Sequence, residues 1–258
     1  MLCESILIIV LQKLFGDEMG LDGKNALVVG VGPGLGSATA YMLLKDGANV
    51  VISARTEQKL KQIAKTLSKY GHVDYVVGDA STQAGAESIV EQAAKKLKRI
   101  DALILTVGNY VSTSLGNVKE ADIDKLLGAN VKAPIFLVNS AKKYMSWGSS
   151  VVLVSSIFGI YRGAKSSYAY SAAKAAVARL AESLAAELVA EGIRVNAVAP
   201  LSMRFDFKPE RDWRRERKIG DADCPPEDVA SVIRWLASDD AEWVDGVVVP
   251  VDGGARLK

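Results

Sequence analysis

Short apolar segments alternate with longer amphipathic segments along most of this 258-residue chain. Apolar runs of five to seven residues that end at glycine, serine or proline are typical of buried parallel strands. We expect strands at 25–30, 49–54, 73–77, 101–107, 151–155, 193–199 and 247–251, and helices between them, the longest at 119–147 and 168–190. This alternation predicts an α/β fold, in which a doubly wound parallel sheet carries helices on both faces.

The first expected strand runs into a glycine-rich turn. Gly30, Gly34 and Gly36 surround the start of a helical pattern that contains Leu35. Glycines let the backbone approach a pyrophosphate closely, and the N-terminus of a helix offers free N–H groups. A tight strand-to-helix connection could use the same glycines, but the strand–turn–helix context favours nucleotide binding. We therefore predict one Rossmann-type catalytic domain over 19–258, with these four residues at its cofactor.

The end of the second strand indicates which cofactor binds. An acidic residue there would bind the adenosine ribose hydroxyls, whereas an arginine suits a 2′-phosphate. This chain has Ala54 and then Arg55. A guanidinium can hold a phosphate with two parallel hydrogen bonds, so the sequence favours NADP(H) over NAD(H). The alternative is that Arg55 is a solvated side chain at a strand end.

Tyr170 and Lys174 are four residues apart in an alanine-rich segment, so on a helix they share one face. A free phenol titrates near pH ~10 and is a poor acid or base at neutrality. A neighbouring ammonium favours the phenolate and lowers its pKa. Such a pair could give a proton to a carbonyl oxygen or take one from an alcohol.

The spacing alone does not single out this pair, because Tyr41/Lys45 and Tyr161/Lys165 repeat it. Tyr170 is distinguished by the features around it: the glycine-rich turn upstream, and a serine at the end of the buried strand just before its helix. Ligands of doubly wound sheets bind at the carboxyl ends of the strands. The residues expected at that edge are Gly30, Asp79, Gly108, Ser156 and Pro200.

The alternation of strands and helices breaks after Pro200. Residues 201–224 are rich in arginine and interleave Phe205, Phe207 and Trp213. A long insertion beside a site is typical of a substrate lid. Its arginines could attract an anionic substrate, or they could form ion pairs on a solvated surface, and the sequence leaves both open.

Composition and charge bear on the partners and on the location of the protein. A net charge of +2 gives no reason to expect nucleic acid or a membrane as a partner. Cys3 and Cys224 form no disulfide or metal pattern, so we expect no metal and a reducing, cytoplasmic location. The single histidine, His72, is expected in a surface loop. Residues 1–18 either come from an upstream start codon or form a short apolar helix that docks on a neighbouring subunit.

Taken together, these motifs resemble those of the short-chain dehydrogenases/reductases, in the compact branch that includes 3-oxoacyl-(acyl carrier protein) reductases. The resemblance covers about 21–254. The matching pieces follow the family's order: Gly30-x-x-x-Gly34-x-Gly36, Asp79, Asn130, Ser155-Ser156, Tyr170-x-x-x-Lys174, Ile193-Arg-Val-Asn-Ala-Val-Ala-Pro200 and Val251-Asp-Gly-Gly254. The combination is far more specific than any one of its parts.

The resemblance implies a role for each of four catalytic residues. Tyr170 would be the acid/base, and Ser156 would hydrogen-bond the substrate oxygen. Lys174 would bind the nicotinamide ribose and lower the pKa of Tyr170. Asn130 would hold a water that connects Lys174 to a proton relay. The nicotinamide would give or take the hydride.

The resemblance also implies which residues touch the rest of the cofactor. Asp79 would contact the adenine and Arg55 the 2′-phosphate. The other expected cofactor residues are Ala80, Gly108 and Pro200, together with the glycine-rich turn, Tyr170 and Lys174.

The chain departs from the family pattern at three places. Val29 replaces the usual threonine before the first glycine, Leu105-Thr106-Val107-Gly108 replaces Asn-Asn-Ala-Gly, and Leu201 replaces the glycine after Pro200. The last change could reshape the nicotinamide pocket. The expected substrate is a 3-oxoacyl thioester, or alternatively a sugar, a polyol or a small ketone. A nucleotide-binding protein without turnover is the alternative outside the enzymes.

The resemblance further implies assembly. The helices expected at 119–147 and 168–190 usually pair across subunits in this family, which predicts a homotetramer or homodimer. The alanines of the second helix would permit close approach, although they could equally pack on the sheet.

Overall fold

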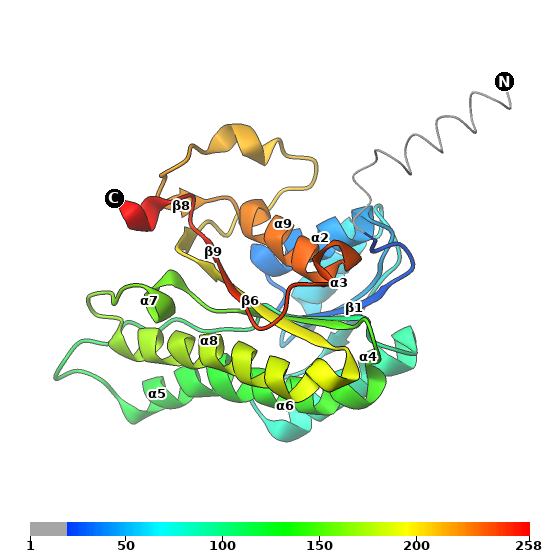
Figure 1. Cartoon of the computed structure of the whole chain (residues 1–258), viewed down its shortest axis with the longest axis horizontal. Helices are drawn as coiled ribbons and strands as arrows, with labels where there is room; N and C mark the ends of the chain where they lie inside the picture. Colours follow the sequence, from blue (N-terminus) through cyan, green and yellow to red (C-terminus); the bar gives the residue numbers. More distant parts are fainter. Residues whose placement is uncertain (1–19) are drawn as a thin grey trace, which may run out of the picture.

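The computed structural model describes residues 20–258, so the expectations about residues 1–18 lie outside the described part. A seven-stranded parallel sheet, in the order β3-β2-β1-β4-β5-β6-β9, runs through its centre (Figure 1). The strands are β1 (Asn25–Val29), β2 (Asn49–Ala54), β3 (Val73–Val77), β4 (Ala102–Leu105), β5 (Ser150–Val154), β6 (Arg194–Pro200) and β9 (Val248–Val251). Each expected strand is present, and the predicted α/β fold with a doubly wound sheet is confirmed.

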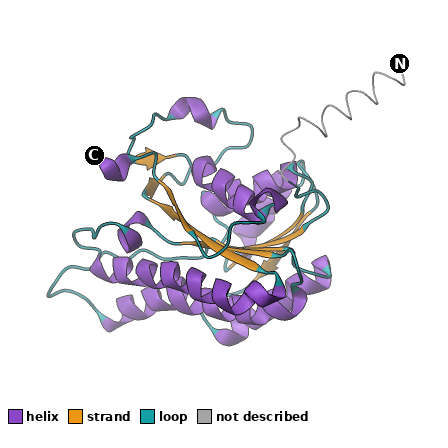
Figure 2. Ribbon diagram, in the orientation of Figure 1, coloured by secondary structure: helices purple, strands orange, loops and turns teal. Residues whose placement is uncertain are grey.

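Helices cover both faces of the sheet (Figure 2). On one face lie α2 (Leu35–Lys45), α3 (Glu57–Leu67) and α9 (Pro226–Ala237), and on the other lie α4 (Gln83–Leu97), α6 (Ala133–Ala141) and α8 (Tyr168–Leu188). The strands feed both cores because successive side chains point to opposite faces. Leu27 and Val29 of β1 pack with the α4 side, and Val28 packs with the α2 side. Full burial of each such side chain stabilises the fold by roughly 1.5–3 kcal/mol.

The single long helix expected at 119–147 is interrupted. It consists of α5 (Glu120–Leu127), a π-helical turn at Gly128–Lys132, α6, and a 3-10 turn at Lys142–Tyr144. Pro134 has no N–H to donate to the carbonyl four residues earlier, which belongs to Asn130. The wider π turn lies just before this proline, and such turns are frequent at functional sites.

The segment after β6 is irregular and lies beside α9 (Figure 1). Its ends form a two-stranded parallel ribbon, β7 (Ser202–Met203) with β8 (Asp223–Cys224), and a 3-10 turn covers Trp213–Glu216. Four of its arginines are in ion pairs with carboxylates: Arg204 with Glu216, Arg211 with Asp206, Glu216 and Glu227, Arg215 with Asp212, and Arg217 with Asp228. These four arginines therefore form ion pairs, which is the second of the two roles expected for the segment.

One of these ion pairs anchors the segment to the core. The side chains of Arg211 and Glu227 are 7% and 2% exposed, and their charged atoms approach to 2.6 Å. Removing one partner of a buried pair leaves the other charge uncompensated. That loss is about 3–5 kcal/mol where nothing else compensates the charge. Because Arg211 also pairs with Asp206 and Glu216, we expect Glu227→Gln to lower the free energy of unfolding by less, about 2 kcal/mol. Thermal and urea unfolding would measure this loss.

The exposed pair of Arg215 and Asp212, at 87% and 61% exposure, provides the matched control. Surface ion pairs contribute about 0–1 kcal/mol, so Asp212→Asn should change stability little. An equal effect of the two substitutions would contradict the anchoring role of Glu227.

The described residues also bear on membrane spanning and on metal binding. No helix within 20–258 combines the length and the apolar character that crossing a membrane requires. Over the same residues, no three side chains of the metal-binding types gather into a cluster that could hold an ion. His72 is exposed, just after α3, as expected.

Candidate active site

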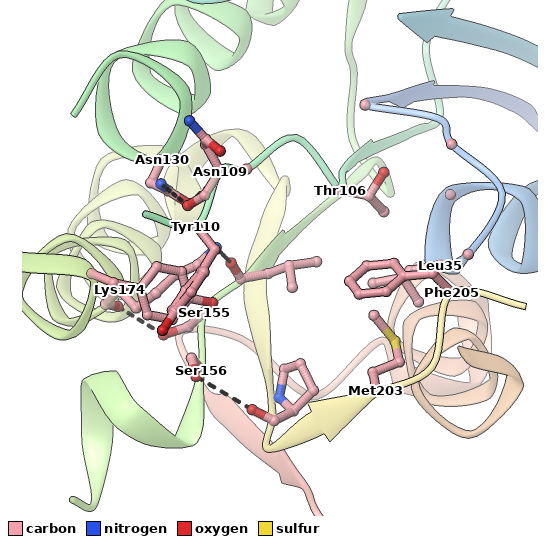
Figure 3. A pocket seen from close by; sticks show the side chains of 18 of the residues that line it. Leu35, Thr106, Asn109, Tyr110, Asn130, Ser155, Ser156, Lys174, Met203 and Phe205 are labelled. Carbon is pink, nitrogen blue, oxygen red and sulfur yellow. Dashed lines mark hydrogen bonds between the residues drawn. The ribbon is translucent and has the colours of Figure 1, made fainter. Parts of the chain in front are cut away.

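A cavity of about 320 Å³ opens at the carboxyl ends of β1, β4, β5 and β6 (Figure 3). Ligands of doubly wound sheets bind at this edge, where the strand order reverses between β1 and β4. The predicted site residues that line it are Gly30, Gly34, Leu35, Gly36, Gly108, Asn130, Ser156, Tyr170, Lys174 and Pro200. Residues from six separate parts of the sequence thus share one cavity.

The glycine-rich turn forms one wall of this cavity, and its backbone leaves no room for side chains at two positions. Gly30 has φ +95°, and a Cβ there would lie 2.3 Å from the backbone nitrogen of Val107. A Cβ on Gly36 would lie 2.7 Å from the Cα of Val31. Helix α2 begins at Leu35 without a side-chain capping hydrogen bond. The glycines therefore bring the free N–H groups of the helix close to the cavity, as a dinucleotide phosphate requires.

Ser156 lies at the end of β5 and caps the short helix α7 (Ile157–Ile160). Its Oγ accepts a hydrogen bond from the Phe158 N–H at 3.2 Å and donates a long one to the Pro200 carbonyl at 3.5 Å. The hydroxyl also interacts with the Tyr170 phenol. A serine so placed can still donate its proton to a ligand oxygen in the cavity.

Tyr170 lies in the first turn of α8, and its phenol is partly removed from water. Burial raises its pKa above the usual value, the hydrogen bond with Ser156 opposes this shift, and the nearby Tyr110 adds to it. The sequence analysis predicted a lowered pKa, and this prediction is wrong for the structure described. Removal from water disfavours the phenolate more than its neighbours stabilise it.

Lys174 lies one turn further along α8 and is only 4% exposed. Its Nζ donates to the Val154 carbonyl at 2.8 Å and lies 5.7 Å from the centre of the Tyr170 ring. Burial lowers the pKa of Lys174 to about 8, so it still carries its charge at neutral pH. Its ammonium thus faces the tyrosine but is bound to the backbone of β5.

Asn130 belongs to the π-helical turn and is buried. Its Nδ2 donates to the carbonyls of Leu126 at 3.0 Å and Asn109 at 2.8 Å, and its Oδ1 accepts from the Asn109 N–H at 3.4 Å (Figure 3). A Cβ on Gly108 would lie 3.0 Å from Asn130 Oδ1 and 3.3 Å from Lys174 Nζ. Glycine at 108 therefore lets these two side chains approach each other. The role of Asn130 in holding a water stays a prediction.

Three predicted cofactor residues do not line the cavity. Arg55 and Asp79 are exposed at the carboxyl ends of β2 and β3, and Ala80 is buried in the core. Hydrogen bonds from Ser81, and then the charge of Arg55, lower the pKa of Asp79. The guanidinium and the carboxylate are therefore neighbours beyond the cavity, on the side of the glycine-rich turn.

The cavity also has lining residues beyond the predicted catalytic and cofactor-binding residues. They are Gly32, Pro33, Thr106, Asn109, Tyr110, Val154, Ser155, Leu201, Met203 and Phe205. Thr106 and Ser155 brace the walls, because Thr106 Oγ1 donates to the Val29 carbonyl at 3.0 Å and Ser155 Oγ to the Lys174 carbonyl at 2.7 Å. The departure at Leu105-Thr106 thus keeps a hydrogen bond to β1. No spacing pattern in the sequence indicates Tyr110 or Phe205.

The start of the 201–224 segment packs against the glycine-rich turn. The Phe207 N–H donates to the Pro33 carbonyl at 3.1 Å, and its ring lies against Tyr41 with the centres 5.4 Å apart. A Cβ on Gly34 would lie 3.1 Å from the Phe205 ring. Residues 205–207 therefore form part of the wall over the turn.

A parallel sheet with this strand order and a glycine turn at its switch point is the architecture of dinucleotide-binding proteins. Residues 30–256 match the family model described as enoyl-(acyl carrier protein) reductase. The chain is 33% identical to the 3-oxoacyl-(acyl-carrier-protein) reductase FabG of Thermotoga maritima, covering 92% of this chain and 99% of the relative. It is 32% identical to meso-2,3-butanediol dehydrogenase of Serratia marcescens, covering 92% and 96%.

A solved structure extends the similarity to the fold. A short-chain dehydrogenase from Burkholderia cenocepacia, in complex with NADP, superimposes with a TM-score of 0.82 and 26% identity, covering 92% of this chain and 99% of that one. The chain belongs to the short-chain dehydrogenase/reductase family, and it is an oxidoreductase.

Proposed function

We propose that this oxidoreductase uses NADP(H) to interconvert a carbonyl and an alcohol, with Ser156, Tyr170 and Lys174 as its catalytic residues. One observation carries the proposal. Ser156 and the buried amine of Lys174 lie across the cavity from Leu35 at the glycine-rich turn (Figure 3), and Tyr170, one helical turn before Lys174 on α8, lines the same cavity. A carbonyl in this cavity can meet a proton donor and a bound dinucleotide at the same time.

The chemistry follows from what each side chain can do. A bound nicotinamide supplies the hydride for reduction and accepts it in oxidation. The raised pKa of Tyr170 keeps its proton in place at neutral pH, so the phenol is ready to protonate a carbonyl oxygen. Ser156 donates a hydrogen bond to the same oxygen and stabilises the charge that develops there. The Lys174 ammonium stabilises the phenolate that remains after the proton has moved.

The phosphates of the cofactor would bind at the glycine-rich turn and the start of α2. The geometry fits, because the backbone at Gly30 and Gly36 excludes side chains and the helix has no cap of its own. Arg55, exposed at the end of β2, would bind the 2′-phosphate, and Asp79 beside it the adenine. Solved relatives in this fold bind NADP, which supports the choice.

We expect Arg55→Ala to weaken NADPH binding about 10–150-fold and to leave NADH binding unchanged. A charge-assisted hydrogen bond to a phosphate is worth about 1.5–3 kcal/mol, and NADH lacks the 2′-phosphate. Titration followed by cofactor fluorescence would measure both affinities. Arg179→Ala, an exposed arginine paired with Glu182 on α8, is the matched control. Equal losses for both cofactors would contradict the assignment.

The substrate that fits best is a carbonyl attached to an apolar chain, such as a 3-oxoacyl thioester. Leu201 and Met203 follow Pro200 in the cavity wall, Phe205 lies over the glycine-rich turn, and among the described residues that line the cavity only Lys174 carries a charge. The similarity to a 3-oxoacyl reductase supports this choice. A small diol or polyol is the second candidate, supported by the similarity to a butanediol dehydrogenase. Comparing kcat/KM for the two classes decides between them.

We also propose that residues 201–224 act as a substrate lid and that the protein is cytoplasmic. We further propose that it assembles as a homotetramer or homodimer. Apolar side chains exposed around α5, α6 and α8 support assembly: Leu127, Ile135 and Val189 are each at least 40% exposed. Light scattering at micromolar concentration tests this, and a monomer would contradict it.

A further inference from the structure

The loop that follows β4 lies against the start of the helix that carries Tyr170. The Thr113 N–H donates to the Ser166 carbonyl at 2.8 Å, and Thr113 and Ser167 form an isolated parallel bridge. The hydroxyls of Ser112 and Ser114 also bond to Ser166, at 3.2 and 3.3 Å. The loop is thus attached to the two residues that immediately precede α8.

The capping of α8 is unusual because it comes from this loop. Ser167 stands at the N-cap position, yet its side chain makes no capping hydrogen bond. The Ala169 N–H in the first turn instead donates to Thr113 Oγ1 at 3.4 Å. An N-cap normally satisfies such an N–H with its own hydroxyl. The hydroxyl of Ser167 is therefore available for another partner.

That partner is Tyr110. The Tyr110 hydroxyl and Ser167 Oγ are 2.9 Å apart and hydrogen-bonded, and Ser167 is buried. The Tyr110 ring meets the Tyr170 ring edge-on, with the ring centres 5.1 Å apart and an interplanar angle of 71°. Tyr110 thus contacts the proposed acid/base directly and also binds the helix just before it.

We propose that Tyr110 is a positioning residue, whose hydrogen bond to Ser167 and edge contact with Tyr170 hold the catalytic phenol toward Ser156. Phe or Leu at 110 could fill the same space but could not bind Ser167. The ring also packs against the Tyr170 ring, and burial is the main cause of the raised pKa of Tyr170. Lys174 and Tyr110 are the ionisable groups that face Tyr170 in the described structure.

A double-mutant cycle tests the positioning hydrogen bond. Tyr110→Phe keeps the ring and removes the hydroxyl, and Ser167→Ala removes its partner, which does not line the cavity. We expect each single substitution to lower kcat about tenfold, because small displacements of a reacting group are costly. The double variant should be no slower than the worse single variant, since both remove the same interaction. Additive losses, or a Ser167→Ala variant with unchanged kcat, would overturn the proposal.

The pH profile provides a readout that a merely structural role would not change. Tyr110→Ala admits water to Tyr170, and relief of burial lowers the pKa of the phenol. In alcohol oxidation the phenolate is the active form, so the rising limb of kcat should move to lower pH. Tyr110→Phe should leave the limb in place. A uniform loss of kcat without a shift in Tyr110→Ala would contradict the shielding part of the proposal.

Controls separate this proposal from the proposed function on which it rests. Tyr168→Phe alters an exposed tyrosine in the same helical turn and should leave kcat unchanged. Unfolding curves and NADPH titrations for every variant show whether fold and cofactor site are intact. If the unmodified protein reduces carbonyls and Tyr170→Phe does not, the proposed function stands, and the cycle alone then decides the role of Tyr110.

Discussion

We expect Tyr170→Phe to lower kcat by about 10³-fold, in the range of losses typical of a missing general acid, and to leave the dissociation constant for NADPH within about twofold. The substitution removes one oxygen atom and keeps the ring that packs against Tyr110. Ser156 is a much weaker acid than the phenol, and the Lys174 ammonium donates to the Val154 carbonyl, so neither is expected to replace the phenol. Steady-state reduction of a carbonyl series, together with cofactor titration, measures both quantities.

Tyr161→Phe is the matched control. Tyr161 is also followed by a lysine four residues later, but it is exposed and its ring lies under the Arg256 guanidinium, 4.8 Å away. We expect this variant to keep full activity. If Tyr170→Phe retained a tenth or more of the kcat, the acid/base assignment would be wrong. A protein that only binds nucleotides would have no activity to lose.

The second large effect concerns the glycine-rich turn. We expect Gly30→Ala to lower the free energy of unfolding by about 4 kcal/mol, a loss found only where a substitution has a specific structural conflict. Alanine at φ +95° is strained, and its Cβ would lie 2.3 Å from the Val107 nitrogen and 2.5 Å from its Cα. Both are backbone atoms, so relief requires β1 and the chain after β4 to separate. Denaturant unfolding would measure the loss.

Gly32→Ala is the control within the same turn. Its φ is not positive, and a Cβ there would meet no atom within 4 Å. Because the side chain would project into open space, stability should change by less than about 0.5 kcal/mol. Any effect of Gly32→Ala should therefore appear in cofactor affinity alone. Equal stability losses at both positions would contradict the close-packed geometry assigned to Gly30.

The sheet was predictable because its signal is local. Each buried strand is a run of apolar residues, and parallel topology follows from the helices between the runs. Topology then places the ends of β1, β4, β5 and β6 at one edge, so the sequence alone assigns Gly30, Gly108, Ser156 and Pro200 to one site. The four-residue spacing of Tyr170 and Lys174, together with the family pattern, was enough to place Tyr170 in the site.

The remaining features depend on contacts between distant segments. Burial raises the pKa of Tyr170, whose ring contacts Tyr110 in the loop that follows β4. The residues around position 170 give no sign of this contact. Tyr110 and Phe205 enter the cavity from loops of irregular structure, without a periodic pattern. The π turn had a local signal in Pro134, four residues after Asn130, but a kinked or broken helix would have produced the same pattern.

The contact between Phe207 and the glycine-rich turn bears on how this protein could acquire a new substrate. Changing the residues after β6 is a direct way to reshape the substrate side of the cavity. However, Phe207 donates a hydrogen bond to the Pro33 carbonyl and Phe205 lies against Gly34, so 205–207 also support the glycine-rich turn. Exchanging the whole segment for that of a relative would therefore disturb cofactor affinity. Grafting only 208–222, with Arg211 retained for its buried pair with Glu227, would keep this support. An engineer seeking a new specificity could then vary most of these residues, while 205–207 would be inherited with the cofactor site.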